Sequence, residues 1–90
     1  MAHHSNELLR EQIGKRLQEL RRRGGITSQE KLAHRAGVHR TYVGRLERGE
    51  TGVTVETLAA ILAPLKVSLA EFFEPFGEVR RLRTPRRRQS

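Results

Sequence analysis

Two short helical segments meet at Gly37 with almost no loop between them, and this junction constrains the fold more than any other feature. The first segment runs roughly from Ser28 to Ala36, and a hydroxyl side chain at Thr27 or Ser28 can cap it. The second runs roughly from His39 to Arg48 and stops at Gly49. A short connection that contains glycine is typical of a helix-turn-helix. Helices this short are marginal alone in water, so other helices must pack against them.

Three further helices are predicted around this pair. One runs from Asn6 to Arg23 and stops at Gly24-Gly25. Another begins after Thr54, and a last one begins after Ser68 and ends at Pro75–Gly77, because proline and glycine interrupt helices. The apolar positions expected to face the core are Leu8, Leu9, Ile13, Leu17, Leu20, Leu32, Ala33, Ala36, Val43, Leu46, Val55, Leu58, Ala59, Ile61, Leu62, Leu65, Leu69, Phe72 and Phe73.

The 90 residues therefore predict an all-α, compact five-helix domain with no strand. We expect residues 1–5 to be a disordered N-terminus, residues 6–76 to form the helix-turn-helix domain, and residues 77–90 to be a basic tail. The tail carries arginine at six positions between 80 and 88. It can act as a flexible arm on phosphates, form a disordered end, or extend a dimer interface.

The charge balance favours a polyanionic partner. Lysine and arginine number 18 against 10 acidic side chains, which gives a net charge of +8, and most of the basic residues are arginine. Phosphate backbones attract such proteins without regard to sequence, and the arginine fork can pair with phosphate or with a guanine edge. The chain has no cysteine and no apolar run of about 18 residues, so neither a disulfide framework nor a membrane span is expected. No nucleophile–base pair, metal-ligand spacing or phosphate loop is evident, so we expect no enzymatic activity, no metal and no cofactor.

The second helix of the pair has two chemically different sides. At 100° per residue, its arginines at 40, 45 and 48 fall with Thr41 and Gly44 within about 140° of arc. Val43, Leu46 and Glu47 lie on the other side, and Tyr42 lies at the margin. The outer side of the helix carries no acid of its own, which suits an anion, and its width suits a DNA groove that admits a helix.

The combination of motifs resembles the phage-repressor (Xre/Cro-like) helix-turn-helix family. The similarity runs from about Ile13 to Phe73, about two-thirds of the chain. The motifs that carry it together are Gln29, Leu32-Ala33, Gly37-Val38, Leu46-Glu47, Gly49, Leu58 and the closing segment VSLAEFF at 67–73. The resemblance implies a compact five-helix, lambda-repressor-like domain that binds DNA as a symmetric dimer.

The resemblance also implies roles for individual side chains. Gln29, at the start of the second helix, would bind a phosphate. Arg40 and Thr41, early in the third helix, would reach base edges, and Arg45 would reach a base or an adjacent phosphate.

Four other residues complete the implied site. Tyr42 and Arg48 would touch the DNA backbone. Arg21, at the end of the first helix, would form a structural ion pair with Glu47, which gives an inward carboxylate the partner that a buried charge needs.

Two positions depart from the expected pattern. His39 stands where a serine or threonine usually caps the third helix; histidine is a poor cap, and the ring can instead meet a phosphate. Gly44 lies in the middle of the outer side, where relatives commonly carry serine. It either allows close approach to DNA or marks the neutral loss of a serine contact.

The function predicted from these features is a sequence-specific transcriptional regulator of a prokaryote, acting as a homodimer on a palindromic operator in double-stranded DNA. The fifth helix, with Leu69, Phe72, Phe73 and Phe76, is the expected dimer surface. The alternative is an antitoxin-type module that binds a partner protein as well as operator DNA. Restriction–modification controllers and prophage regulators fit equally. The expected location is the cytoplasm, at the nucleoid.

Overall fold

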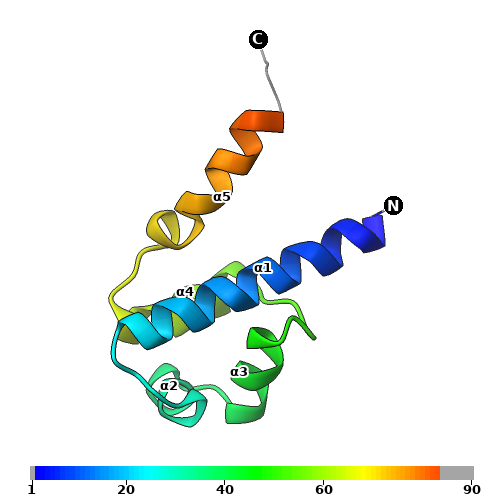
Figure 1. The fold of residues 1–90 in the computed structure, drawn as a ribbon. Coiled ribbons are helices and arrows are strands. Elements are labelled where there is room, and N and C mark those ends of the chain that lie inside the picture. The colour runs from blue at the N-terminus through cyan, green and yellow to red at the C-terminus, as the bar shows by residue number, and fades with distance from the viewer. Residues whose placement is uncertain (1, 84–90) are drawn as a thin grey trace.

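The computed structural model describes the backbone of residues 2–83 and the side chains of residues 7–77. Figure 1 shows a long first helix across the middle, with α2 and α3 below it, α4 behind it, and α5 leading away from the body. The elements are α1 (Ala2–Arg23), α2 (Gln29–Ala36), α3 (Arg40–Glu47), α4 (Val55–Leu62), a 3₁₀ turn η1 (Ala63–Leu65) and α5 (Leu69–Arg83). The expected all-α, five-helix architecture is confirmed, and the described residues contain no strand.

Local side chains define where the short helices start and stop. The backbone N–H of Lys31 donates to the Ser28 hydroxyl at 2.9 Å, so Ser28 rather than Thr27 is the cap of α2. The chain then leaves α2 through Gly37, whose φ of 76° lies in the left-handed region that favours glycine. Thr54 and Ser68 cap α4 and α5 in the same way.

A single core joins the helices. Its buried members are Leu17, Leu20, Ile26, Leu32, Ala33, Val43, Leu46, Leu58, Ile61, Leu62 and Phe72. The apolar stripe of α1 is used only in part, because Leu8 and Leu9 are exposed, as is Val55 of α4. The N-terminal half of α1 extends beyond the helices that it would need to pack against (Figure 1).

One glycine sets how closely α1 crosses α3. A Cβ atom on Gly14 would lie 2.5 Å from the carbonyl oxygens of both Leu46 and Glu47. Such a contact is too short for any side chain, so only glycine allows the last turn of α3 to touch the α1 backbone. This crossing places the end of α3 against the middle of α1.

Both terminal helices are longer than the sequence suggested. Helix α1 begins at Ala2 rather than at Asn6, and α5 continues through Pro75 to Arg83. Proline lacks the N–H that would bond to the carbonyl of Glu71 four residues earlier. The guanidinium of Arg16 on α1 replaces it: Nη2 donates to the Glu71 carbonyl and Nε to the Phe72 carbonyl, both at 2.8 Å.

The division of the chain at residues 5 and 77 stays a prediction, and residues 84–90 of the basic tail lie outside the described residues.

The aromatic side chains of α5 serve the core of the same molecule. Phe72 is 0% exposed, so the expectation that it belongs to a dimer surface is wrong. Phe73 and Phe76 pack around it, with ring centroids 4.9 and 6.1 Å from that of Phe72, and both rings are half-buried. Leu69 is half-buried against the same cluster. The first two turns of α5 therefore lie on the core, and Leu69, Phe73 and Phe76 keep part of their apolar surface exposed.

Candidate nucleic-acid interface

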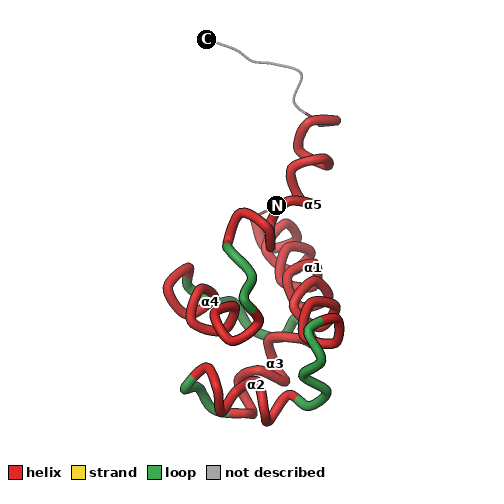
Figure 2. The backbone as a smooth tube through the Cα atoms, turned by 90° about the vertical axis from the view of Figure 1, so that its left-hand side faces the viewer, coloured by secondary structure: helices red, strands yellow, loops and turns green. Residues whose placement is uncertain are grey.

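Helix α3 presents basic side chains outward at one end of the molecule. Arg40, Thr41 and Arg45 are exposed, as is Arg48 just after the helix, while Val43 and Leu46 are buried. Figure 2 shows α2 and α3 together at the end of the molecule opposite the last turns of α5. The two sides of α3 expected from the sequence are therefore present, and its outer side lies beside the start of α2.

The inner side of α3 is anchored by a buried ion pair. Arg21 Nε donates to Glu47 Oε2 at 2.7 Å, and Arg21 Nη2 donates to Glu47 Oε1 at 3.1 Å. The third guanidinium nitrogen donates to the carbonyl of Ile26 at 3.1 Å. A parallel pair of bonds of this kind is both strong and directional, and it compensates both charges for the loss of water.

Gln29 is bonded to the same carboxylate. Its side-chain Nε2 donates to Glu47 Oε1 at 2.9 Å. Because an ionised carboxylate only accepts hydrogen bonds, Glu47 fixes which end of the Gln29 amide faces inward. The carbonyl oxygen therefore faces the other way, across α3, and one N–H of the amide is left for another acceptor.

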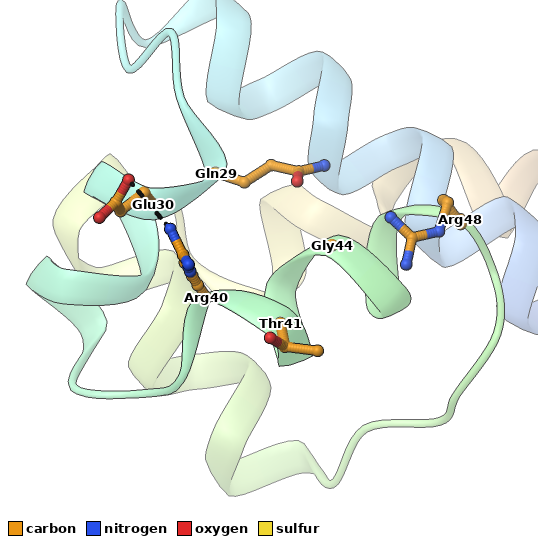
Figure 3. Close-up of a pocket in the computed structure, with 6 residues that line it drawn as sticks. All are labelled: Gln29, Glu30, Arg40, Thr41, Gly44 and Arg48. Carbon is orange, nitrogen blue, oxygen red and sulfur yellow. Dashed lines mark ion pairs between the residues drawn. The ribbon is translucent and has the colours of Figure 1, made fainter.

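Gly44 lies among the residues of the outer side of α3, but other side chains cover it, so it is buried. A Cβ atom there would lie 3.1 Å from Gln29 Oε1 and 3.2 Å from Arg48 Nη1. Figure 3 shows Gln29 reaching from α2 across α3, with the Arg48 guanidinium turned toward Gly44. The glycine therefore makes room for these two side chains.

Acidic side chains accompany the exposed arginines, although α3 itself supplies no acid to its outer side. Glu30 on α2 lies 3.7 Å from Arg40 Nη1. Glu50, just after α3, accepts from Arg48 Nε at 2.9 Å and lies 4.0 Å from Arg45 Nε. The helical wheel missed both carboxylates because it compares positions within one helix.

The Arg48–Glu50 contact also changes the acidity of its members. The hydrogen bond from Arg48 lowers the pKa of the Glu50 carboxyl, and the bond to Glu50 raises the pKa of Arg48. Both groups therefore keep their charges throughout the neutral pH range.

Two residues near the ends of α3 hold it in place. The backbone N–H of Thr41 donates to His39 Nδ1 at 3.1 Å, so the side chain of His39 caps α3. A ring that accepts at Nδ1 keeps Nε2 as a donor. The Tyr42 hydroxyl donates to the carbonyl of Gly52 at 3.2 Å and thus ties α3 to the turn that follows it. Burial raises the pKa of Tyr42, which preserves this donor.

A concave surface that encloses a volume of about 400 Å³ lies between the start of α2 and the outer side of α3. Its lining residues are Gln29, Glu30, Arg40, Thr41, Gly44 and Arg48 (Figure 3). Five of them were singled out in the sequence as DNA contacts, and Glu30 was not. Arg45 and Tyr42 belong to α3 but are not among the residues that line this concave surface.

The chain is similar to several known proteins. Residues 17–72 match the helix-turn-helix family HTH_3. Control protein C.SmaI of Serratia marcescens is 42% identical over 50 residues, which cover 56% of this chain and 60% of that protein. The HTH-type transcriptional regulator y4dJ of Sinorhizobium fredii is 37% identical over 70 residues, which cover 78% of this chain and 90% of that protein.

A solved structure agrees with these similarities. The crystal structure of an HTH_3 family transcriptional regulator from Vibrio cholerae superposes with a TM-score of 0.74 at 31% identity. The match covers 82% of this chain but only 41% of the other. This chain therefore spans less than two-thirds of that regulator and of the control protein.

Proposed function

The chain belongs to the HTH_3 family of helix-turn-helix transcriptional regulators, and we propose that it binds a palindromic operator as a homodimer with α3 as the recognition helix. The observation that carries this proposal is the geometry of α3. Its inner side is locked by Glu47 to Arg21 and Gln29, while its outer side presents arginines beside the start of α2. An exposed, basic helix on a fixed base suits insertion into a major groove.

Each exposed side chain has a proposed role. Arg40 and Thr41, in the first turn of α3, read base edges, and Arg45 reaches a base or an adjacent phosphate. Arg48 binds a phosphate, and so does Gln29, through the amide N–H that Glu47 does not use. In this arrangement the base-reading groups come from α3 and the groups that fix its register come from both helices.

His39 and Tyr42 are placed at the edge of this surface. His39 Nε2 can donate to a phosphate while Nδ1 caps α3, because the two nitrogens are distinct. The Tyr42 hydroxyl already donates its hydrogen to the carbonyl of Gly52. Its proposed DNA contact therefore uses the edge of the ring, or a water molecule that donates to the hydroxyl oxygen. Both residues therefore combine a structural bond with the proposed contact.

The proposed dimer joins two copies through α5. Since Phe72 is inside the core, the proposed surface consists of the exposed parts of Leu69, Phe73 and Phe76. That helix leads away from the body at the end opposite α3 (Figure 1). Two recognition helices in such a dimer would serve half-sites about 34 Å apart, which is one DNA turn.

The similarity to a protein named a control protein supports a controller-type regulator over the antitoxin-type alternative. The proposed place of action is the nucleoid in the cytoplasm. Among the described residues, no helix is long and apolar enough to cross a membrane.

Selection of binding sites from a random duplex pool tests the proposal. We expect the wild-type chain to enrich a sequence with two inverted half-sites, and the mass of the free protein at micromolar concentration to be that of a dimer. The dimer would be contradicted if a single half-site were enriched and if the protein had the mass of a monomer both free and bound to DNA. If no sequence were enriched, the proposal that the chain binds a specific DNA sequence would be contradicted.

A further inference from the structure

The turn after α3 holds a carboxylate against Arg48 on the proposed DNA surface. Arg48 Nε donates to Glu50 Oε2 at 2.9 Å, and Arg48 Nη2 lies 3.3 Å from Glu50 Oε1. These are two roughly parallel bonds between a guanidinium and a carboxylate, the geometry in which such a pair is strongest. Neither bond uses Nη1, which lies over Gly44 beside the Gln29 amide.

The backbone gives Glu50 little freedom to leave this position. The N–H of Glu50 donates to the carbonyl of Arg45 at 2.9 Å, and the N–H of Gly49 donates to that of Leu46 at 3.1 Å. These two bonds form the helix-ending motif in which the glycine takes a left-handed conformation, here with φ of 76°.

Helix α1 also packs against this turn. A Cβ atom on Gly49 would lie 3.0 Å from Cγ of Glu11, so the turn is in direct contact with a long helix of the core. An exposed ion pair normally gains little, because two long side chains must be ordered to form it. Here the main chain of Glu50 is already fixed, so only side-chain torsions remain to be ordered.

We propose that Glu50 is a positioning residue for DNA recognition: it orients Arg48 so that Nη1 points over Gly44, toward the DNA phosphate that Arg48 binds. The guanidinium has five N–H groups, and the pair with Glu50 uses two of them. The remaining groups can bind a phosphate while the pair stays intact. This inference rests on the proposed function, because it needs α3 to bind DNA.

Simple electrostatics predicts the opposite effect of removing Glu50. A carboxylate near a DNA surface repels phosphates, so its neutralisation should strengthen binding to any duplex. A positioning role predicts weaker binding at the selected operator, because a free arginine must lose rotamer freedom when it binds. The sign of the change at the operator therefore separates the two.

The test compares Glu50→Gln with wild type on the duplex enriched by wild type and on an unrelated duplex. We expect Glu50→Gln to bind both duplexes about fivefold more weakly than wild type, because the phosphate that Arg48 is proposed to bind is present in every sequence. Glu56→Gln removes the same charge from an exposed position on α4, outside the candidate interface and the proposed dimer surface, and should show no such loss. Equal or tighter binding of Glu50→Gln to the enriched duplex would overturn the inference.

A double-mutant cycle identifies the residue through which Glu50 acts. In an Arg48→Ala background, Glu50→Gln should cause no further loss at the enriched duplex, because Arg48 is no longer there to be positioned. In an Arg45→Ala background the loss should persist. The reverse pattern would assign the effect to Arg45, which lies 4.0 Å from the carboxylate, and would overturn the assignment to Arg48.

The pair is also tested without DNA. The Nε–H resonance of Arg48 in an NMR spectrum should move in Glu50→Gln and stay in place in Glu56→Gln. An unmoved resonance would overturn the inference whatever the DNA result. A moved resonance in a protein that enriches no duplex would instead contradict the proposed function, and the role of Glu50 in recognition with it.

Discussion

The two sides of α3 use the same chemical pair in different surroundings. Arg21 and Glu47 meet on the inner side, with side chains 4% and 1% exposed, whereas Arg48 and Glu50 meet on the outer side, at 56% and 49%. Charges without access to water cannot exchange partners at low cost, but charges in water can. The inner pair therefore maintains the fold, and the outer pair is free to serve recognition.

A glycine accompanies each pair and shows the same contrast. Gly14, behind the inner side, faces backbone carbonyls of α3, which cannot move without moving a helix. Gly44, under the outer side, faces the ends of the flexible side chains of Gln29 and Arg48. The same substitution should thus have a structural effect at one position and a functional effect at the other.

The largest expected effect comes from breaking the inner pair. Glu47→Ala leaves the buried guanidinium of Arg21 uncompensated and removes the partner of Gln29, so we expect a loss of about 3–5 kcal/mol in the free energy of unfolding. Denaturant titration measures it. Glu50→Ala is the matched control on the outer side, and its unfolding midpoint should stay at the wild-type value. If both variants unfolded at the same denaturant concentration, the buried pair would contribute no more to stability than the exposed pair.

Gly14→Ala should be the next most damaging change. Its methyl group would meet carbonyl oxygens at 2.5 Å, so α1 and α3 must move apart, at a cost of about 1–3 kcal/mol. Thermal unfolding followed by circular dichroism gives the change. Gly77→Ala is the control, because a Cβ atom there meets nothing within 4 Å; we expect it to raise the melting temperature. A Gly14→Ala variant as stable as wild type would show that α1 does not cross α3 this closely.

On the outer side, Arg40→Ala should leave stability unchanged but relax sequence discrimination. If Arg40 reads a base edge, its loss costs about 1–3 kcal/mol at one base position of the operator. Binding titrations against a set of singly substituted operators measure this effect. Arg48→Ala, which removes a proposed phosphate contact, should instead weaken binding to every sequence equally. Uniform loss in both variants would contradict direct readout by Arg40.

Gly44→Ala should have a small effect on stability, about 0.5 kcal/mol in either direction. A helical glycine costs about 0.5–1 kcal/mol relative to alanine, and the displacement of Gln29 and Arg48 offsets part of that gain. Because those two side chains are proposed phosphate ligands, we expect weaker DNA binding in the same variant. A more stable protein with unchanged affinity would show that their placement over Gly44 is irrelevant to recognition.

The smallest effect is the pH response of the outer pair. Since the folded-state pKa of Glu50 is lowered, the contribution of the pair is complete above the ordinary value for glutamate, 4.5, and disappears as pH falls through the lowered value. An NMR titration of the Glu50 carboxyl should have its midpoint below the ordinary value. In Arg48→Ala the midpoint should return toward that value, and an unchanged midpoint would exclude the pair.

The helix-turn-helix was predictable because Gly37, its flanking caps and the apolar spacing are all local in the sequence. The full length of α5 was not, because Pro75 interrupts a helix unless a distant donor replaces its missing N–H, and that donor, Arg16, lies 55 positions away from Glu71. Leu8 and Leu9 fit the periodicity of α1 but lie beyond the helices that could bury them.

Within the candidate site, sequence reasoning found residues of α3 better than their neighbours from other segments. The outward arginines followed from a single helical wheel. Glu30 and Glu50 did not, because their positions depend on how α2 and the turn at 49–50 fold beside α3. The cover over Gly44 was missed for the same reason, since it consists of Gln29 from α2 and the turn residue Arg48.

The bonds from Arg16 to the carbonyls of Glu71 and Phe72 join the beginning of α5 to α1. In a dimer joined through α5, the angle between α1 and α5 would determine where the partner's α3 lies. A small rotation of α5 near Arg16 would therefore displace that helix by a large distance. The number of base pairs between operator half-sites would then depend on an arginine that lies outside the candidate interface. Chains with the same α3 but another residue at position 16 would read the same half-site at a different spacing.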